Sequence, residues 1–187
     1  MNEIFAKLAA RKKTTMEITK PDLSLFNPYI ATYVNLVKSE DLYTELYKES
    51  METIELFTSL DEETLLFKYE ASKWTVKEIF QHIIDCERVF QYRILSIARN
   101  PEVPLAGFDH NIFVETSMAD KRDIYDMVRE FSMVRGSTVE ILKSLANAAW
   151  DKMGVANNNP ASVRSIAYML LGHEIHHRTV IEKKYLL

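Results

Sequence analysis

Apolar residues recur every three or four positions along four long stretches of the chain, which predicts four amphipathic α-helices. The first helix is expected from its N-cap Ser39 to Leu60. The second begins after a capping box, in which Thr75 and Glu78 satisfy each other's backbone donors, and runs to about Arg99. Its buried stripe is predicted to consist of Val76, Ile79, Phe80, Ile83, Cys86, Phe90, Ile94 and Ile97.

The third helix is expected over about 119–147, and the fourth from 160–162 almost to the C-terminus. Residues 61–71 are predicted to be a connection with a single helical turn at most, and the three asparagines at 157–159 to lie in a loop. The segment 101–118 contains prolines, a glycine and alternating polar residues, which predicts an irregular loop. A loop of this length inside a compact domain favours a functional role, and we expect it to lie over one end of the bundle.

A single all-α domain is expected. Only four glycines and five prolines in 187 residues leave little material for the turns of an all-β fold. Four long helices with medium-length connections favour a four-helix bundle, which we assign to residues 29–187. Residues 1–28 are interrupted by Pro21 and Pro28 and are predicted to be an N-terminal arm, whose basic run 11–13 is interpreted as a solvated face.

Charge and composition argue against several classes of partner. The formal net charge of −4 gives no broad positive field, so we expect neither nucleic acid nor anionic lipid to bind. No stretch approaches the roughly 18 apolar residues needed to span a bilayer, and no apolar signal core follows the N-terminus. We therefore expect a cytoplasmic protein. The single Cys86 cannot form an internal disulfide and is interpreted as a small buried core residue.

Three histidines on inward-facing helix stripes are the candidate metal ligands. His173 and His177 are four positions apart and therefore lie on the same face of the fourth helix. His82 lies on the inward side of the second helix. His176 is rotated by about 100° from this pair and is excluded. Three neutral imidazoles with one coordination position left open form a site that supports Zn²⁺ chemistry.

Other interpretations of these histidines are open at this point. All three could be hydrogen-bonded core residues without a metal. The run from His173 to His177 also matches the H-E-x-x-H pattern of zinc peptidases, in which the glutamate acts as general base. The chain offers no further histidine after His177, which argues against a peptidase. Glu174 is nevertheless kept as a weak candidate for the base.

Two further polar residues have an open role. Asp85, three positions after His82, either accepts the free ring N–H of that histidine or lies on a solvated helix surface. His110, in the segment 101–118, is either simply exposed or gates the access of a substrate.

These residues belong to a sequence that resembles the DinB/YfiT-like superfamily of metalloenzymes from Phe26 to Leu187. The passages that carry the resemblance are Phe26-Asn27-Pro28-Tyr29, Lys73-Trp74-Thr75-Val76-Lys77-Glu78, His82-Ile83-Ile84-Asp85 with Glu87-Arg88, Gly107-Phe108-Asp109, Asn159-Pro160, and Gly172-His173 through His177-Arg178. The resemblance implies a four-helix bundle that holds a divalent metal through His82, His173 and His177. It also implies a homodimer and a link to stress. The chain differs from similar sequences in its longer N-terminal arm and in having His110 at a position where they usually carry an amide or another polar residue.

The resemblance and the histidines together predict a divalent-metal-dependent enzyme that acts on a small molecule. Related branches resemble S-transferases that use low-molecular-weight thiols, and others are called hydrolases; the two versions differ only in the nucleophile. Zn²⁺ is the expected ion, and Ni²⁺, Fe²⁺ or Mn²⁺ fit the same ligands. The alternative prediction is a non-catalytic, stress-associated binding protein in which the metal is structural and clamps the second and fourth helices together.

Overall fold

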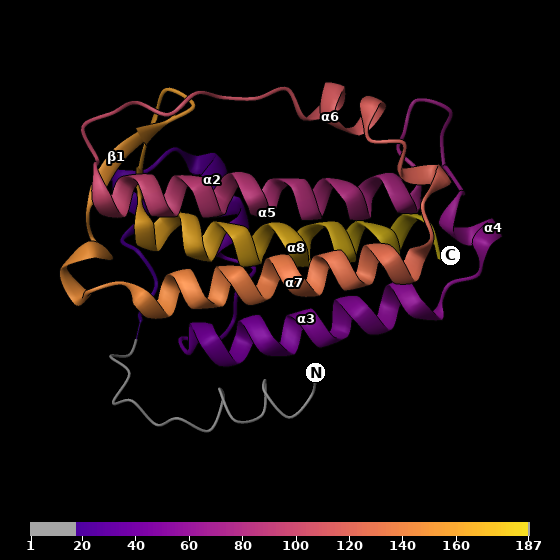
Figure 1. Ribbon diagram of the computed structural model, residues 1–187, viewed down its shortest axis with the longest axis horizontal. Helices are drawn as coiled ribbons and strands as arrows, with labels where there is room; N and C mark the ends of the chain where they lie inside the picture. The colour runs from indigo at the N-terminus through magenta and orange to yellow at the C-terminus, as the bar shows by residue number, and fades with distance from the viewer. Residues whose placement is uncertain (1–17, 187) are drawn as a thin grey trace.

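The computed structural model describes residues 18–186, and residues 1–17 and 187 lie outside the described part. Its four long helices, α3 (Leu42–Ser59), α5 (Val76–Arg99), α7 (Ile124–Ser144) and α8 (Val163–Lys184), run side by side along the longest axis (Figure 1). The predicted, mostly helical four-helix bundle is confirmed. No helix within residues 18–186 combines the length and the apolarity needed to cross a membrane. The basic run predicted at 11–13 falls outside the described residues.

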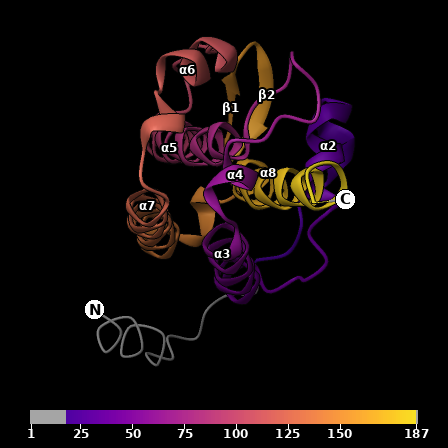
Figure 2. The same cartoon turned by 90° about the vertical axis from the view of Figure 1, so that its right-hand side faces the viewer.

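The order of the helices around the bundle differs from their order along the chain. α5 packs against α7 and α8, and α3 packs against the same two helices. The consecutive long helices α3 and α5 consequently occupy one diagonal of the bundle (Figure 2). Their connection crosses the end of the bundle and contains only the short helix α4 (Glu62–Leu65), which agrees with the single turn predicted there.

Side-chain caps fix the helix starts that were predicted correctly. Thr75 and Glu78 form the expected capping box of α5: the Thr75 hydroxyl accepts from the Glu78 amide at 3.0 Å, and the Glu78 carboxylate accepts from the Thr75 amide at 2.8 Å. Ser162 caps α8, within the range predicted for its start. Both caps satisfy amides that would otherwise lack an intrahelical partner.

Two helix starts were predicted wrongly, in each case because an aspartate further along the chain forms the cap. The carboxylate of Asp41 accepts from the Thr44 amide at 3.2 Å, so α3 begins two residues after the expected position, and Ser39 only supports the turn before it. Asp123 caps α7 in the same way. The residues at which this helix was expected to begin form the separate 3₁₀ turn η2 (Ala119–Lys121), and α7 ends before the predicted 147.

A β-hairpin replaces the loop predicted before the fourth helix. Strands β1 (Met153–Ala156) and β2 (Asn159–Ser162) pair antiparallel and are joined by Asn157 and Asn158, whose φ angles are 51° and 60°. Two positive φ angles in a two-residue connection favour a type I′ turn, and asparagine tolerates this conformation better than most residues. The short hairpin closes one end of the bundle (Figure 1).

The segment 101–118, predicted to be irregular throughout, contains the helix α6 (His110–Thr116). Asp109 caps this helix by accepting from the amides of Asn111 and Ile112, at 2.8 and 3.3 Å. α6 packs against α5 on the outside of the bundle rather than over one of its ends (Figures 1 and 2). Its three apolar residues, Ile112, Phe113 and Val114, are consecutive rather than at helical spacing, and only Val114 is buried, which explains why the pattern did not reveal this helix.

The chain before α3 adds another helix to the bundle. After the 3₁₀ turn η1 (Leu23–Leu25), Asn27 caps α2 (Pro28–Val34), in which Pro28 occupies the first helical position. α2 packs beside α8 (Figure 2). The two helices touch at Gly172, where an added Cβ would lie 2.0 Å from the carbonyl oxygen of Tyr33. Only glycine allows this close approach.

Polar side chains occupy the middle of the bundle, between two apolar clusters. One cluster surrounds Trp150 at the hairpin end, and the other surrounds Phe57, Phe80 and Phe131. The rings of Phe57 and Phe80 stack with their centroids 3.9 Å apart. The buried polar residues between the clusters include Glu49, His82, Glu87, Arg135, His173, Glu174 and Arg178. Burying such groups without hydrogen-bond or ion-pair partners costs free energy, so the contacts among them indicate where a functional site lies.

We predict that Gly172→Ala destabilises the protein by about 2 kcal/mol, because the new methyl group forces α2 away from α8. Alanine normally stabilises a helix by up to about 1 kcal/mol relative to glycine, so the expected sign is the reverse of the intrinsic preference. Urea unfolding measures the effect. Gly136→Ala, within α7, is the control and should leave stability unchanged or slightly raised. Equal stability of Gly172→Ala and wild type would contradict the close contact.

Candidate metal centre

Three imidazoles from two helices converge in the middle of the bundle. The Nε2 atom of His173 lies 3.1 Å from that of His82 on α5 and 3.1 Å from that of His177, one turn further along α8. One ligand atom from each of the three rings lies within 4.8 Å of the others, and no other group of metal-ligating side chains in residues 18–186 does so. His82 and His173 are buried, and His177 is partly buried. The three residues singled out in the sequence are thus brought together.

The donor set fits a divalent metal ion. A tetrahedral Zn²⁺ with Zn–N bonds of 2.0–2.1 Å separates its nitrogen ligands by about 3.3 Å, close to the spacing of these Nε2 atoms. A neutral imidazole nitrogen has a single in-plane lone pair or a single proton, so His173 Nε2 cannot form a good hydrogen bond with both neighbours at once. One cation between the three rings satisfies all of them. His82, His173 and His177 are therefore the residues that would hold the ion.

Burial keeps these imidazoles in the neutral form that binds metals. It lowers the pKa of His82 to about 4, with a smaller contribution from the charge of His110. Burial and, after it, the neighbouring histidines lower the pKa of His173 and His177 well below the usual value. Protons therefore compete weakly with a metal ion for these nitrogens near neutral pH.

Apolar and aromatic side chains surround the cluster. The ring of Trp74 lies 4.9 Å from that of His82, and the rings of Tyr33 and Phe90 lie 5.5 and 5.8 Å from that of His173. Cys86 is buried, as predicted, and its sulfur lies 3.6 Å from both ring nitrogens of His82. Burial raises the pKa of this thiol to about 12, so it stays protonated beside the site.

The other two described histidines lie at the edge of the cluster. The ring of His176 is half-buried and packs against Tyr33 and His177, with centroid distances of 5.5 and 5.1 Å, and it does not belong to the converging set. His176 was excluded from the metal ligands on the basis of the sequence, and its position agrees with that prediction. His110 is exposed, as one of the two interpretations of the sequence held, yet its ring lies only 5.6 Å from that of His82.

Glu174, the weak candidate for a general base, is engaged elsewhere. Its carboxylate accepts from the hydroxyl of Thr53 and from the guanidinium of Arg135, each at 2.6 Å. Burial raises the pKa of Glu174, and Arg135 opposes that rise. Both oxygens are thus held by α3 and α7, on the side of α8 that faces the bundle interior, and we do not carry the base role forward. The sequence did not single out Arg135, because its spacing does not distinguish it from a surface arginine.

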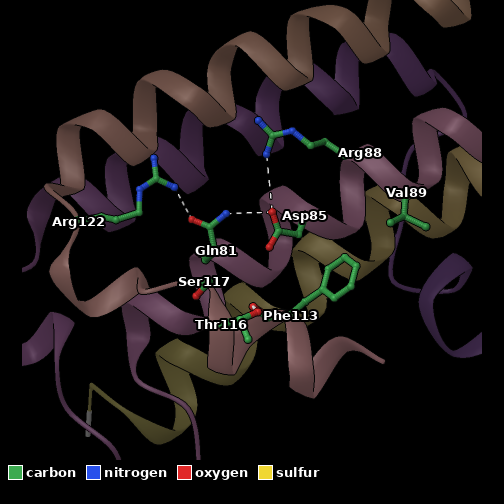
Figure 3. A pocket seen from close by; sticks show the side chains of 8 residues that line it. All are labelled: Gln81, Asp85, Arg88, Val89, Phe113, Thr116, Ser117 and Arg122. Carbon is green, nitrogen blue, oxygen red and sulfur yellow. Dashed lines mark hydrogen bonds and ion pairs between the residues drawn. The ribbon is translucent and has the colours of Figure 1, made fainter. Parts of the chain in front are cut away.

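Asp85 does not support His82; it lies partly exposed on the outer side of α5, which is nearer to the second of its two expected roles. It accepts from Gln81 Nε2 at 3.0 Å and forms no hydrogen bond with His82. It lines a separate cavity of about 600 Å³ between α5 and α6, together with Gln81, Arg88, Val89, Phe113, Thr116, Ser117 and Arg122 (Figure 3). None of the three clustered histidines lines this cavity, so it is distinct from the candidate metal centre.

Comparison with known proteins gives a family match and a structural match. The sequence model of the DinB superfamily matches residues 45–181. YfiT from Bacillus subtilis, described as a probable metal-dependent hydrolase with an unusual four-helix bundle topology, is similar in structure, with a TM-score of 0.68 and 13% sequence identity over 79% of this chain and 87% of that chain. No curated protein matches the chain significantly. At this identity the likeness to YfiT establishes the fold alone.

We predict that the metal-free protein loses stability in acid because the folded state resists protonation of the clustered histidines. The contribution of each of these histidines to the free energy of unfolding is fully present above the unfolded pKa of 6.5. It is lost as the pH falls towards the folded pKa, which for His82 is about 4. The loss from His82 alone is about 3 kcal/mol. Urea unfolding of chelator-treated protein between pH 7.5 and 4.5 measures it. His82→Gln should flatten the pH slope, and an unchanged slope would contradict the assigned shift.

We predict that His177→Ala weakens Zn²⁺ binding by about 100-fold or more, because loss of a direct ligand should cost at least as much as loss of a residue that only supports one. Isothermal titration calorimetry measures the affinity and the stoichiometry. His176→Ala is the matched control, since it removes the neighbouring imidazole and should change the affinity by less than about threefold. A loss in His177→Ala as small as that in the control would contradict the assignment of His177 as a ligand, and an equally large loss in His176→Ala would contradict its exclusion.

Proposed function

Because this chain belongs to the DinB superfamily and brings three buried imidazoles together, we propose that it is a metal-dependent enzyme acting on a small molecule. The observation that carries the proposal is the convergence of the Nε2 atoms of His82, His173 and His177. These residues would hold the ion and leave one side of it accessible. A bound divalent ion would act as a Lewis acid and lower the pKa of a nucleophile beside it.

Zn²⁺ is the ion we propose. Three imidazole donors at tetrahedral spacing suit it, and Ni²⁺, Fe²⁺ and Mn²⁺ remain compatible with the same donors. Within residues 18–186, no carboxylate forms a hydrogen bond or an ion pair with the three rings, whose contacts are with other rings and with the thiol of Cys86. The charge of a dication would therefore not be compensated by any carboxylate bonded to the rings that hold it, which favours an anionic nucleophile or an anionic group on the substrate.

Hydrolysis is the first form of the reaction that we propose. It is supported by the similarity of the fold to YfiT, which is described as a probable metal-dependent hydrolase. Transfer to a low-molecular-weight thiol is the second form, because a thiolate would meet the same uncompensated charge. In both forms Trp74, Tyr33 and Phe90 would limit the access of water and offer apolar contact to the body of the substrate.

The alternative of a purely structural metal is less well supported. Helices α5, α7 and α8 are already joined by ion pairs, in which Arg135 binds Glu87 at 2.8 Å and Glu174 at 2.6 Å. Apolar clusters fill the bundle on both sides of the polar layer. A bundle with these contacts does not depend on a metal clamp between α5 and α8 in the way that a small zinc domain does.

We predict that the Zn²⁺-loaded protein turns over at least one substrate in a panel that pairs small esters and amides with water, and electrophiles with low-molecular-weight thiols. Products are followed by mass spectrometry. Chelation should abolish turnover, added Zn²⁺ should restore it, and His173→Ala should be inactive, because the proposed chemistry depends on the ion held by that residue.

Product from the esters and amides indicates a hydrolase, and product from the electrophiles and thiols indicates a transferase. If no substrate is converted while chelation unfolds the protein, the metal is structural and the enzymatic proposal is wrong.

A further inference from the structure

His110 brings a fourth imidazole to the candidate metal centre, from a different element. Its ring centroid lies 5.6 Å from that of His82, slightly farther than the 4.8 and 5.0 Å that separate His82 from His177 and His173. Trp74 contacts both His82 and His110, with centroid distances of 4.9 and 5.8 Å.

The helix that carries His110, α6, makes few buried contacts with the rest of the protein. Val114 is the one buried residue of α6, and the His110 side chain is exposed. Phe113 and Thr116 of the same helix line the cavity of about 600 Å³, so one side of α6 borders open space (Figure 3). Elements with few buried apolar contacts can shift at low cost in free energy. A shift of α6 relative to α5 would therefore expose only one residue of this helix that is now buried, Val114.

We propose that His110 is an exchangeable fourth ligand, which α6 delivers to the ion held by His82, His173 and His177 and which an external anion must displace. This inference rests on the metal centre of the proposed function. Imidazole is among the commonest metal ligands, and a neutral nitrogen donor completes the tetrahedral set without adding charge. No described residue forms a hydrogen bond with the ring of His110, so the ring loses no such bond when it moves. α6 would thus act as a lid that closes the centre in the absence of substrate.

Competition between an internal ligand and an external one has a measurable consequence. If His110 occupies the fourth position for nine-tenths of the time, it weakens the apparent affinity for an external anion about tenfold. Removing the imidazole should abolish this competition. It should also change the set of donors around the ion, and the absorption of a bound transition metal reports such a change directly.

The test uses the full chain loaded with Co²⁺, whose visible absorption reports its ligands, and azide as the external anion. Wild type, His110→Ala and His176→Ala are compared; His110 is exposed, and circular dichroism checks that its variant is folded. We expect His110→Ala to bind azide about tenfold more tightly than wild type and to show a different Co²⁺ spectrum before azide is added. His176→Ala, which removes an imidazole that α6 does not carry, should match wild type within about twofold.

The possible failures are distinguishable. If wild type binds one Co²⁺ but the spectrum and the azide affinity are the same in His110→Ala, the proposal that His110 is a fourth ligand is wrong. The three-histidine metal centre is then still supported. If wild type binds no Co²⁺, both the lid and the proposed function are wrong.

Discussion

A single buried guanidinium connects all four long helices. Arg135 on α7 donates to Glu87 on α5 at 2.8 and 2.9 Å and to Glu174 on α8 at 2.6 Å. It also donates to Ser50 Oγ and the Leu46 carbonyl oxygen on α3, at 2.7 and 3.2 Å. Burial by itself would lower the pKa of Arg135, but Glu174 and Glu87 outweigh it and raise that pKa. Removing one partner of such a buried pair typically costs about 3–5 kcal/mol, so the network strongly restrains the rotation of each helix.

The geometry of the metal centre follows from this restraint. Glu174 directly follows His173, and neighbouring residues on an α-helix point about 100° apart. When Glu174 faces Arg135, α8 has no freedom to turn His173 anywhere but towards α5. Glu87 fixes the rotation of α5 in the same way, which aims His82 at the same point. Charged groups that take no part in metal binding therefore set the positions of the groups that do.

Features encoded over a few residues could be predicted from the sequence, whereas those that depend on the packing of distant segments could not. The capping box at Thr75 and the shared face of His173 and His177 follow from helical geometry alone. The convergence of His82 with that pair also required a hypothesis about the fold, which the four predicted amphipathic helices supplied and the family resemblance supported. α6 was not predicted because it is stabilised by the cap of Asp109 and by the single buried residue Val114, and not by an apolar stripe. The hairpin left a signal in Asn157 and Asn158, which we interpreted as an ordinary loop.

The same dependence on packing decides what the H-E-x-x-H pattern means in this chain. In a zinc peptidase the glutamate between the two histidines faces the ion and acts as base. Here α8 packs against α3 as well as α5, and the glutamate position turns towards Thr53 and Arg135 instead. Two imidazoles one turn apart are therefore compatible with very different chemistry, depending on which neighbour holds the residue between them. With Glu174 engaged, activation of a nucleophile would rest on the ion itself.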